Sequence, residues 1–199
     1  MKVLRWGQSA TAIFLGFTFF GAGMAKLYAE HQFIGWIGPV WLIEQLEQYK
    51  LGLYAHFIAL SQVVIGFTLL TPRFRSLGAV MLVPMLLNIL LITISQQWTG
   101  TPYLVSILLG MNGFLLFMDA PKLLPLVQPD RIYIPSRLQK YTWAGHFIWL
   151  SGLLVVLGAI PLSFRFLHLS YGLVAGGLLL SFLSHKADPS FSMETKKAV

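Results

Sequence analysis

The chain has 199 residues, of which 56% are hydrophobic and 11% are charged, and its formal net charge at pH 7 is +7. Because soluble domains carry roughly 25% charged residues, this composition indicates an integral membrane protein. The basic residues lie in short segments between apolar runs, which favours membrane topology and argues against nucleic acid as a partner. The chain contains no cysteine, which excludes disulfides, thiolate metal ligands and thiol redox chemistry.

Six apolar runs are long enough to form transmembrane helices, since a helix needs about 20 mainly apolar residues to cross the hydrocarbon core. We therefore expect an all-α, polytopic membrane protein with six transmembrane helices. The predicted spans cover residues 8–27, 52–71, 77–96, 103–119, 142–160 and 166–184.

Lysine and arginine predict the orientation of these spans, because basic residues are retained on the cytoplasmic side during insertion. Of the 14 Lys and Arg residues, only Lys26, Lys50 and Arg165 fall on the opposite side from the rest. Both termini are therefore expected in the cytoplasm. An alternative interpretation of the first span is a secretory signal peptide cleaved after Ala25, although its apolar region exceeds the usual length of roughly 7–15 residues.

Residues 28–51 form the longest predicted outer segment. Gly-Pro at 38–39 interrupts it, and apolar residues then recur at helical spacing from Trp41 to Tyr49, which predicts a short amphipathic helix. Two interpretations stay open. The segment is either an interfacial anchor, with Trp36 and its other aromatic residues at headgroup level, or a lid over an outward-facing pocket.

The rest of the chain divides by composition. Residues 1–125 form a four-helix membrane unit, 126–141 a cytoplasmic linker, 142–185 a transmembrane hairpin and 186–199 a polar tail that we expect to be mobile. Four prolines between residues 120 and 141 argue against a continuous helix there, and the basic residues of that segment are expected to meet anionic lipid headgroups.

Glycine spacing predicts where helices pack closely, because small residues let two helices approach each other. The first span carries several glycines between residues 16 and 23. Gly172 and Gly176 are four residues apart, and Gly110 and Gly113 form a second small-residue pair. We interpret all three groups as helix contacts.

Several motifs in the first 125 residues form a recognisable set. The glycine-spaced first span ends in Lys26-Leu27, and SQVVIGFTLLTPRFRSLGAV begins at residue 61. Gly-Thr-Pro stands at 100–102, before the fourth span, and Asp119 stands at its end. Over about residues 5–125 these features resemble the DoxX family of small bacterial membrane proteins. The last two spans lie outside this resemblance.

The resemblance implies a class of function and leaves the reaction open. Some DoxX proteins are membrane subunits of a thiosulfate:quinone oxidoreductase, so the resemblance implies an accessory or quinone-facing subunit of a redox-linked membrane complex. Its implied partners are membrane lipids and other membrane subunits. Many DoxX proteins have an acidic residue at the second-span polar position, whereas this chain has Gln62, so a role that needs a carboxylate there is not carried over.

Three amide side chains are expected near the bilayer midplane. Gln62, Asn88 and Asn112 fall at that depth on the second, third and fourth spans. An unsatisfied polar group in hydrocarbon costs on the order of several kcal/mol, so each amide needs a partner. They either share one polar centre or serve separately as interhelical hydrogen bonds.

Five ionisable side chains are expected at one depth near the outer face: Lys26, Glu30, His31, His56 and His168. In an outward-facing pocket Lys26 would bind an anionic or quinone-carbonyl group while Glu30 or His31 handles a proton. The alternatives are that Lys26 extends to the interface or pairs with Glu30 one turn away.

The positions of the histidines indicate whether the chain has ligands for haem or for a metal ion. His56 and His168 are the one pair on separate spans at equal depth, as axial haem ligands would be. A single pair without further support does not favour haem, and no ligand spacing typical of a metal site is present.

Three classes of function remain: a quinone-facing subunit, a carrier or receptor for a small molecule or lipid, and a structural subunit of a larger assembly.

Overall fold

The computed structural model describes residues 2–128, 137–139, 141–188 and 190–192. Six helices in this part of the chain are long and apolar enough to cross a membrane, which confirms the predicted multi-pass, helical fold. These helices are α1 (Lys2–Leu27), α3 (Gly52–Leu70), α4 (Arg75–Ser95), α5 (Thr101–Val127), α6 (Trp143–Ser163) and α7 (Leu167–Leu183). The shorter elements are η1 (Ala29–His31), α2 (Leu42–Glu47), η2 (Ser184–Ala187), β1 (Arg137–Gln139) and β2 (Ser190–Ser192).

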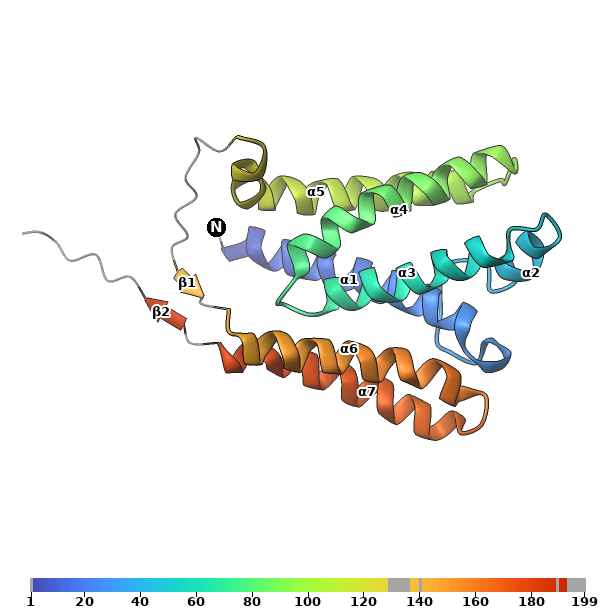
Figure 1. The fold of residues 1–199 in the computed structure, drawn as a ribbon. Coiled ribbons are helices and arrows are strands. Elements are labelled where there is room, and N and C mark those ends of the chain that lie inside the picture. The colour runs from blue at the N-terminus through green and yellow to red at the C-terminus, as the bar shows by residue number, and fades with distance from the viewer. Residues whose placement is uncertain (1, 129–136, 140, 189, 193–199) are drawn as a thin grey trace, which may run out of the picture.

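The six long helices form three layers (Figure 1). The pair α1 and α3 lies in the middle, with α4 and α5 on one side and α6 and α7 on the other. Each outer pair shares an apolar core with the middle pair: Leu82 and Leu108 pack with Leu15 in one core, and Val156 packs with Met24 and Val63 in the other. We call the end of the bundle that carries the N-terminus the terminal end and the opposite end the distal end.

Glycines bring α1 and α3 into close contact. A Cβ atom added to Gly66 would lie 2.2 Å from the backbone nitrogen of Phe20, and one added to Gly23 would lie 2.6 Å from the Ala59 carbonyl oxygen. These distances confirm the contact predicted for the first span. The contacts predicted for the other glycine pairs are wrong within the described chain: an added Cβ at either Gly172 or Gly176 has no neighbour within 4 Å.

The same holds for Gly110 and Gly113 on α5, where an added Cβ also has no neighbour within 4 Å. Helix α7 instead packs on α6 through Gly177, whose added Cβ would lie 2.6 Å from the Gly152 carbonyl oxygen. A spacing of four identifies a small-residue face, but the sequence alone does not say which face meets a neighbouring helix.

Helix α5 continues past its predicted end at residue 119. It includes Pro121 and Pro125 and ends at Val127, so the expectation that prolines end the helix was wrong for this stretch. A proline inside a helix removes one N–H donor and strains the preceding turn, yet α5 continues through both prolines to Val127. Of the predicted linker, residues 129–136 and 140 lie outside the described residues, and Arg137–Gln139 pairs as β1 with β2 in an antiparallel ladder.

The start of the predicted mobile tail packs on the bundle instead. Residues Ser184–Ala187 form η2, and the side chain of Asp188 is buried in an ion pair with Arg73. Arg73 also donates to the carbonyl oxygens of Thr142 (3.1 Å) and Ser184 (3.4 Å). This cluster ties the α3–α4 turn to both ends of the α6–α7 hairpin. Residue 189 and residues 193–199 of the predicted tail lie outside the described part.

Candidate functional site

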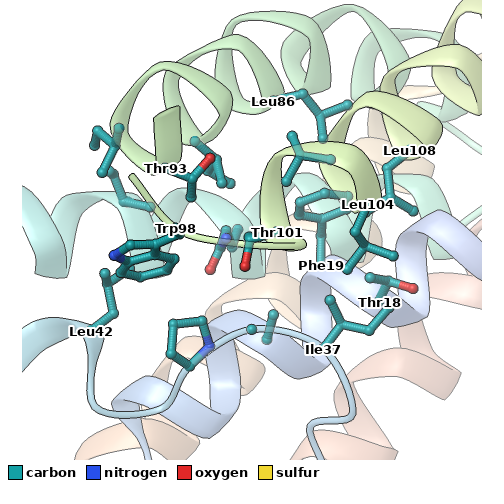
Figure 2. Close-up of a pocket in the computed structure, with 18 of the residues that line it drawn as sticks. Thr18, Phe19, Ile37, Leu42, Leu86, Thr93, Trp98, Thr101, Leu104 and Leu108 are labelled. Atoms are coloured by element: carbon teal, nitrogen blue, oxygen red, sulfur yellow. The ribbon is translucent and has the colours of Figure 1, made fainter. Parts of the chain in front are cut away.

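A cavity of about 600 Å³ lies within the four-helix unit formed by α1, α3, α4 and α5, toward the distal end. Figure 2 shows apolar side chains such as Phe19, Leu86 and Leu108 pointing into it, together with the hydroxyl-bearing Thr18 and Thr93. Of the described residues that line this cavity, one is ionisable, Lys26. The chamber is therefore a mainly apolar space with a single basic group in its wall.

Lys26 and Gln62 form the polar part of the cavity wall. Lys26 is buried near the end of α1, and its Nζ donates to the Ala22 carbonyl oxygen (2.8 Å) and to Gln62 Oε1 (3.2 Å). Gln62 is equally buried on α3. Among the described residues no carboxylate lies within 4.0 Å of the Lys26 amine, whose charge therefore has no ion-pair partner there.

The segment from Ile37 to Leu42 covers the cavity. Gly38 adopts a φ of 101°, which favours glycine, and a Cβ added there would lie 3.4 Å from Lys26 Nζ. The Trp41 ring lies 5.5 Å from the Trp98 ring, which belongs to the α4–α5 turn. The segment therefore lines the cavity while Trp36 and Trp41 remain exposed, and both interpretations of residues 28–51, anchor and lid, fit this arrangement.

Helix α2 holds this covering segment in place. Its Ile43 and Leu46 are buried and pack against Ala55 and Ala59 of α3. The sequence predicted this helix but assigned its apolar side partly to Tyr49, which lies beyond the end of α2 and is exposed. Helix α2 stops at Glu47 because Lys50 has a φ of 60°, a left-handed conformation that ends the helical path.

A second pocket of about 520 Å³ lies on the other side of Lys26, at the distal surface. Lys26 lines both pockets, and Glu30, His31 and His56 line only the second, together with Glu44 and Glu47. We call this second pocket the vestibule. The structure thus groups four of the five predicted outer ionisable residues, with Lys26 as the wall between the two spaces.

The side chains of the vestibule have their own partners. His31 contacts the Ala25 carbonyl oxygen through Nδ1 (2.9 Å) and Glu44 Oε1 through Nε2 (3.1 Å). Glu30 accepts from Gln32 Nε2 at 2.9 Å. The predicted i,i+4 pair between Lys26 and Glu30 does not form, because α1 ends at Leu27 and Glu30 takes a left-handed φ of 50°.

The remaining predicted histidine lies apart. His168 is exposed on α7 and lines neither the cavity nor the vestibule. The ring of His56 contacts the Gly52 carbonyl oxygen through Nδ1 at 2.9 Å. Within the described residues, no group of three or more His, Asp or Glu side chains is arranged to hold a metal ion.

The three midplane amides do not form one polar centre. Gln62 bonds to Lys26 on α1, Asn88 accepts from Tyr54 on α3, and Asn112 Nδ2 donates to the Ala79 carbonyl oxygen on α4 at 3.0 Å. Each amide therefore links its own pair of helices, as the alternative interpretation had it. Asn88 lines a separate pocket of about 320 Å³ between α3 and α4, and Asn112 is fully buried.

Asp119 lies far from the cavity, at the terminal end. Its carboxylate accepts from Gln8 Nε2 (3.0 Å), Ser76 Oγ (2.7 Å) and Lys122 Nζ (2.6 Å). These contacts join α1, α4 and α5 and satisfy the buried carboxylate. The position that contributed to the family resemblance therefore has a structural explanation in this chain.

Several cavity residues were missed by the sequence analysis. Thr18 and Ala22 precede Lys26 at intervals of four, so one face of α1 carries all three toward the cavity. That spacing was available as a signal. Trp98 and Thr101 come from the α4–α5 turn, and only the packing of α1 against α5 brings that turn over the same space.

The fold and the cavity define a class: a multi-pass helical membrane protein with a mainly apolar pocket at one end of its bundle. Compared with known proteins, no family model and no solved structure matches the chain. The uncharacterized protein YwoB of Bacillus subtilis (strain 168) is 31% identical over 145 residues, which cover 66% of this chain and 89% of YwoB. The chain therefore belongs to the family of YwoB.

Proposed function

We propose that this protein binds an amphiphilic molecule from the membrane, with the polar head on Lys26 and Gln62 and the apolar part in the cavity. The single observation that carries this proposal is a buried amine, without a carboxylate partner among the described residues, in the wall of an apolar chamber of about 600 Å³. Ligand pockets typically have volumes of roughly 300–1,000 Å³, with few polar groups in a mainly apolar lining.

The donors of the site favour a head that accepts hydrogen bonds. A lysine ammonium has three N–H donors, and two are used by Ala22 and Gln62. The Gln62 oxygen is used by Lys26, so this amide offers its NH₂ group to a ligand. A carbonyl, carboxylate or phosphate oxygen would satisfy these donors.

Two ligand classes satisfy this requirement. The DoxX resemblance favours a quinone and an accessory subunit of a redox-linked complex in a bacterial inner membrane, with both termini in the cytoplasm. The apolar lining also suits a lipid, which would make the protein a carrier or receptor. In both cases the role derived from the cavity is binding.

The test is to identify the small molecules that remain with the protein after purification in mild detergent. Mass spectrometry of the extracted wild type is expected to find an amphiphile that is strongly depleted in Lys26→Met and Gln62→Leu. Asn88→Leu is the matched control, because this amide lines a different pocket. Equal recovery of every amphiphile from all four proteins would overturn the proposal. A copurified quinone would favour the redox subunit, and a lipid would favour the carrier.

A further inference from the structure

We infer that the cavity takes an anionic amphiphile, with a carboxylate head on Lys26 and Gln62. This inference rests on the proposed function and adds the charge of its ligand. Three observations support this ligand charge: the charge of the cavity wall, the position of the neighbouring carboxylates and the free donors of Lys26 and Gln62.

Among the described residues that line the cavity, one is charged and none neutralises it. Lys26 is 6% exposed, and every other lining residue is apolar, aromatic, a threonine or an amide. An ammonium in such surroundings is unfavourable unless an anion pairs with it. A neutral head would accept a hydrogen bond but leave the charge unpaired, whereas a carboxylate supplies both the acceptor and the counter-charge.

The acidic residues nearest to this site lie in the vestibule, on the other side of Lys26. Glu30, Glu44 and Glu47 line the vestibule and not the cavity. Glu44 pairs with His31, and Glu30 accepts from Gln32. The vestibule also contains His56 and Tyr28, and none of these groups forms a salt bridge or hydrogen bond with Lys26 in the described structure.

The free donors fit the two oxygens of one carboxylate. Lys26 Nζ and Gln62 Oε1 are 3.2 Å apart, so the remaining lysine N–H and the Gln62 NH₂ group belong to two neighbouring side chains of the cavity wall. A carboxylate has two oxygens and accepts from two neighbouring donors at once. The apolar tail would then extend past Phe19, Leu104 and Leu108, which project into the cavity in Figure 2.

The experiment compares a fatty acid with its own methyl ester. Dibromostearate and methyl dibromostearate have the same tail, and only the acid carries a charge. Bromine quenches tryptophan at short range, and Trp41 and Trp98 line the cavity. Wild-type protein in nanodiscs of neutral lipid is titrated with each compound at neutral pH. The double variant Trp41→Phe/Trp98→Phe measures quenching at the other tryptophans.

We expect the wild type to bind the acid at least about tenfold more tightly than the ester, because a charge-assisted hydrogen bond contributes enough for about that ratio. Lys26→Met should lose this preference, and Lys26→Arg should keep part of it. Gln62→Glu places a carboxylate beside Lys26 and should abolish acid binding while the ester still binds. Asn88→Leu should behave as the wild type.

Each outcome decides one of the two claims. If the ester binds in the cavity as tightly as the acid, and Lys26→Met weakens both to the same extent, the anionic ligand is overturned while amphiphile binding at Lys26 stands. If neither compound quenches the wild type more than the double tryptophan variant does, the cavity does not bind such amphiphiles and the proposed function falls as well. Acid binding that survives in Gln62→Glu also contradicts the inference.

Discussion

The two ends of this bundle each bury a basic side chain, and they treat its charge in opposite ways. At the terminal end Arg73 pairs with Asp188, donates to two carbonyl oxygens and stacks against the Tyr141 ring at 5.0 Å. At the distal end Lys26 has one carbonyl and one amide as its partners and faces a cavity. The difference separates a charge that holds the fold together from one that is available to a ligand.

The chemistry of the two side chains suits these roles. The guanidinium of arginine has five N–H donors in a fixed plane and meets several acceptors at once, as Arg73 does between the α3–α4 turn and the hairpin. The compact ammonium of lysine keeps a donor free. Removal of the two charges should therefore have opposite effects on stability, and the following predictions test that contrast.

Arg73→Met should have the largest effect. Removal of one partner from a buried ion pair leaves the other charge without compensation and costs about 3–5 kcal/mol. Equilibrium unfolding in mixed micelles should show a loss of this order. Arg73→Met/Asp188→Leu should recover much of it, because no charge then remains unpaired. A loss below about 1 kcal/mol in the single variant would mean that Arg73 does not hold the hairpin.

The free energy of unfolding should also depend on pH, because of the carboxyl group of Asp188. Burial alone would raise the pKa of this carboxyl, but hydrogen bonds from Thr142 and from Arg73 outweigh burial and hold the pKa below its usual value. The unfolded chain therefore takes up the proton at a higher pH than the folded chain does. The stabilisation is complete above the unfolded pKa of about 3.9 and is lost as the pH falls through the lower folded value.

The measurement is an unfolding series between neutral pH and about pH 3. The free energy of unfolding should fall more steeply toward acid in the wild type than in Asp188→Asn, which has no carboxyl to protonate. Parallel curves for the two proteins would show that this ion pair is not the source of the acid dependence.

Lys26→Met should have a smaller effect of opposite sign. Without ligand, the substitution removes a buried charge that lacks a carboxylate partner and fills its space with an apolar chain, so the protein should gain about 1 kcal/mol of stability. The same unfolding measurement on delipidated protein tests this. A loss comparable to that of Arg73→Met would show that Lys26 is part of the structural framework and remove the contrast.

Chemical labelling should distinguish the two ends without a large change in stability. The chain contains no cysteine, so one introduced cysteine gives the only thiol signal. Lys26→Cys should react with a small water-soluble thiol reagent, because position 26 lines the cavity and the vestibule. Asn112→Cys should not, because that side chain is fully buried and lines neither space. Equal rates at both positions would mean that the distal end is no more accessible than the core.

The sequence determined the number and the type of the long elements. Six apolar runs of about 20 residues leave few alternatives, because the backbone must satisfy its own hydrogen bonds in lipid. The glycines of α1 predicted a close helix contact for a similarly local reason, since only a residue without a Cβ fits at Gly23; the structure shows that α3 makes this contact, with its own Gly66. Local composition carries the number of spans in full, whereas glycine spacing identified the contact face on α1 and failed for the glycine pairs of α5 and α7.

Only the tertiary structure decided which polar groups meet. Asp188 lies 115 residues from Arg73, and no local pattern marks the two as partners. Lys26 and Gln62 share a depth that the sequence could estimate, but their contact depends on the rotation of α1 against α3 about the helix axes. A pair between Lys26 and Glu30 would need α1 to continue through residue 30. Because α1 ends at Leu27, the pair does not form and the Lys26 amine faces the cavity. Hydropathy fixes the depth of a side chain in the membrane. Its neighbours are fixed by the rotation of each helix about its axis and by where each helix ends and the chain folds back.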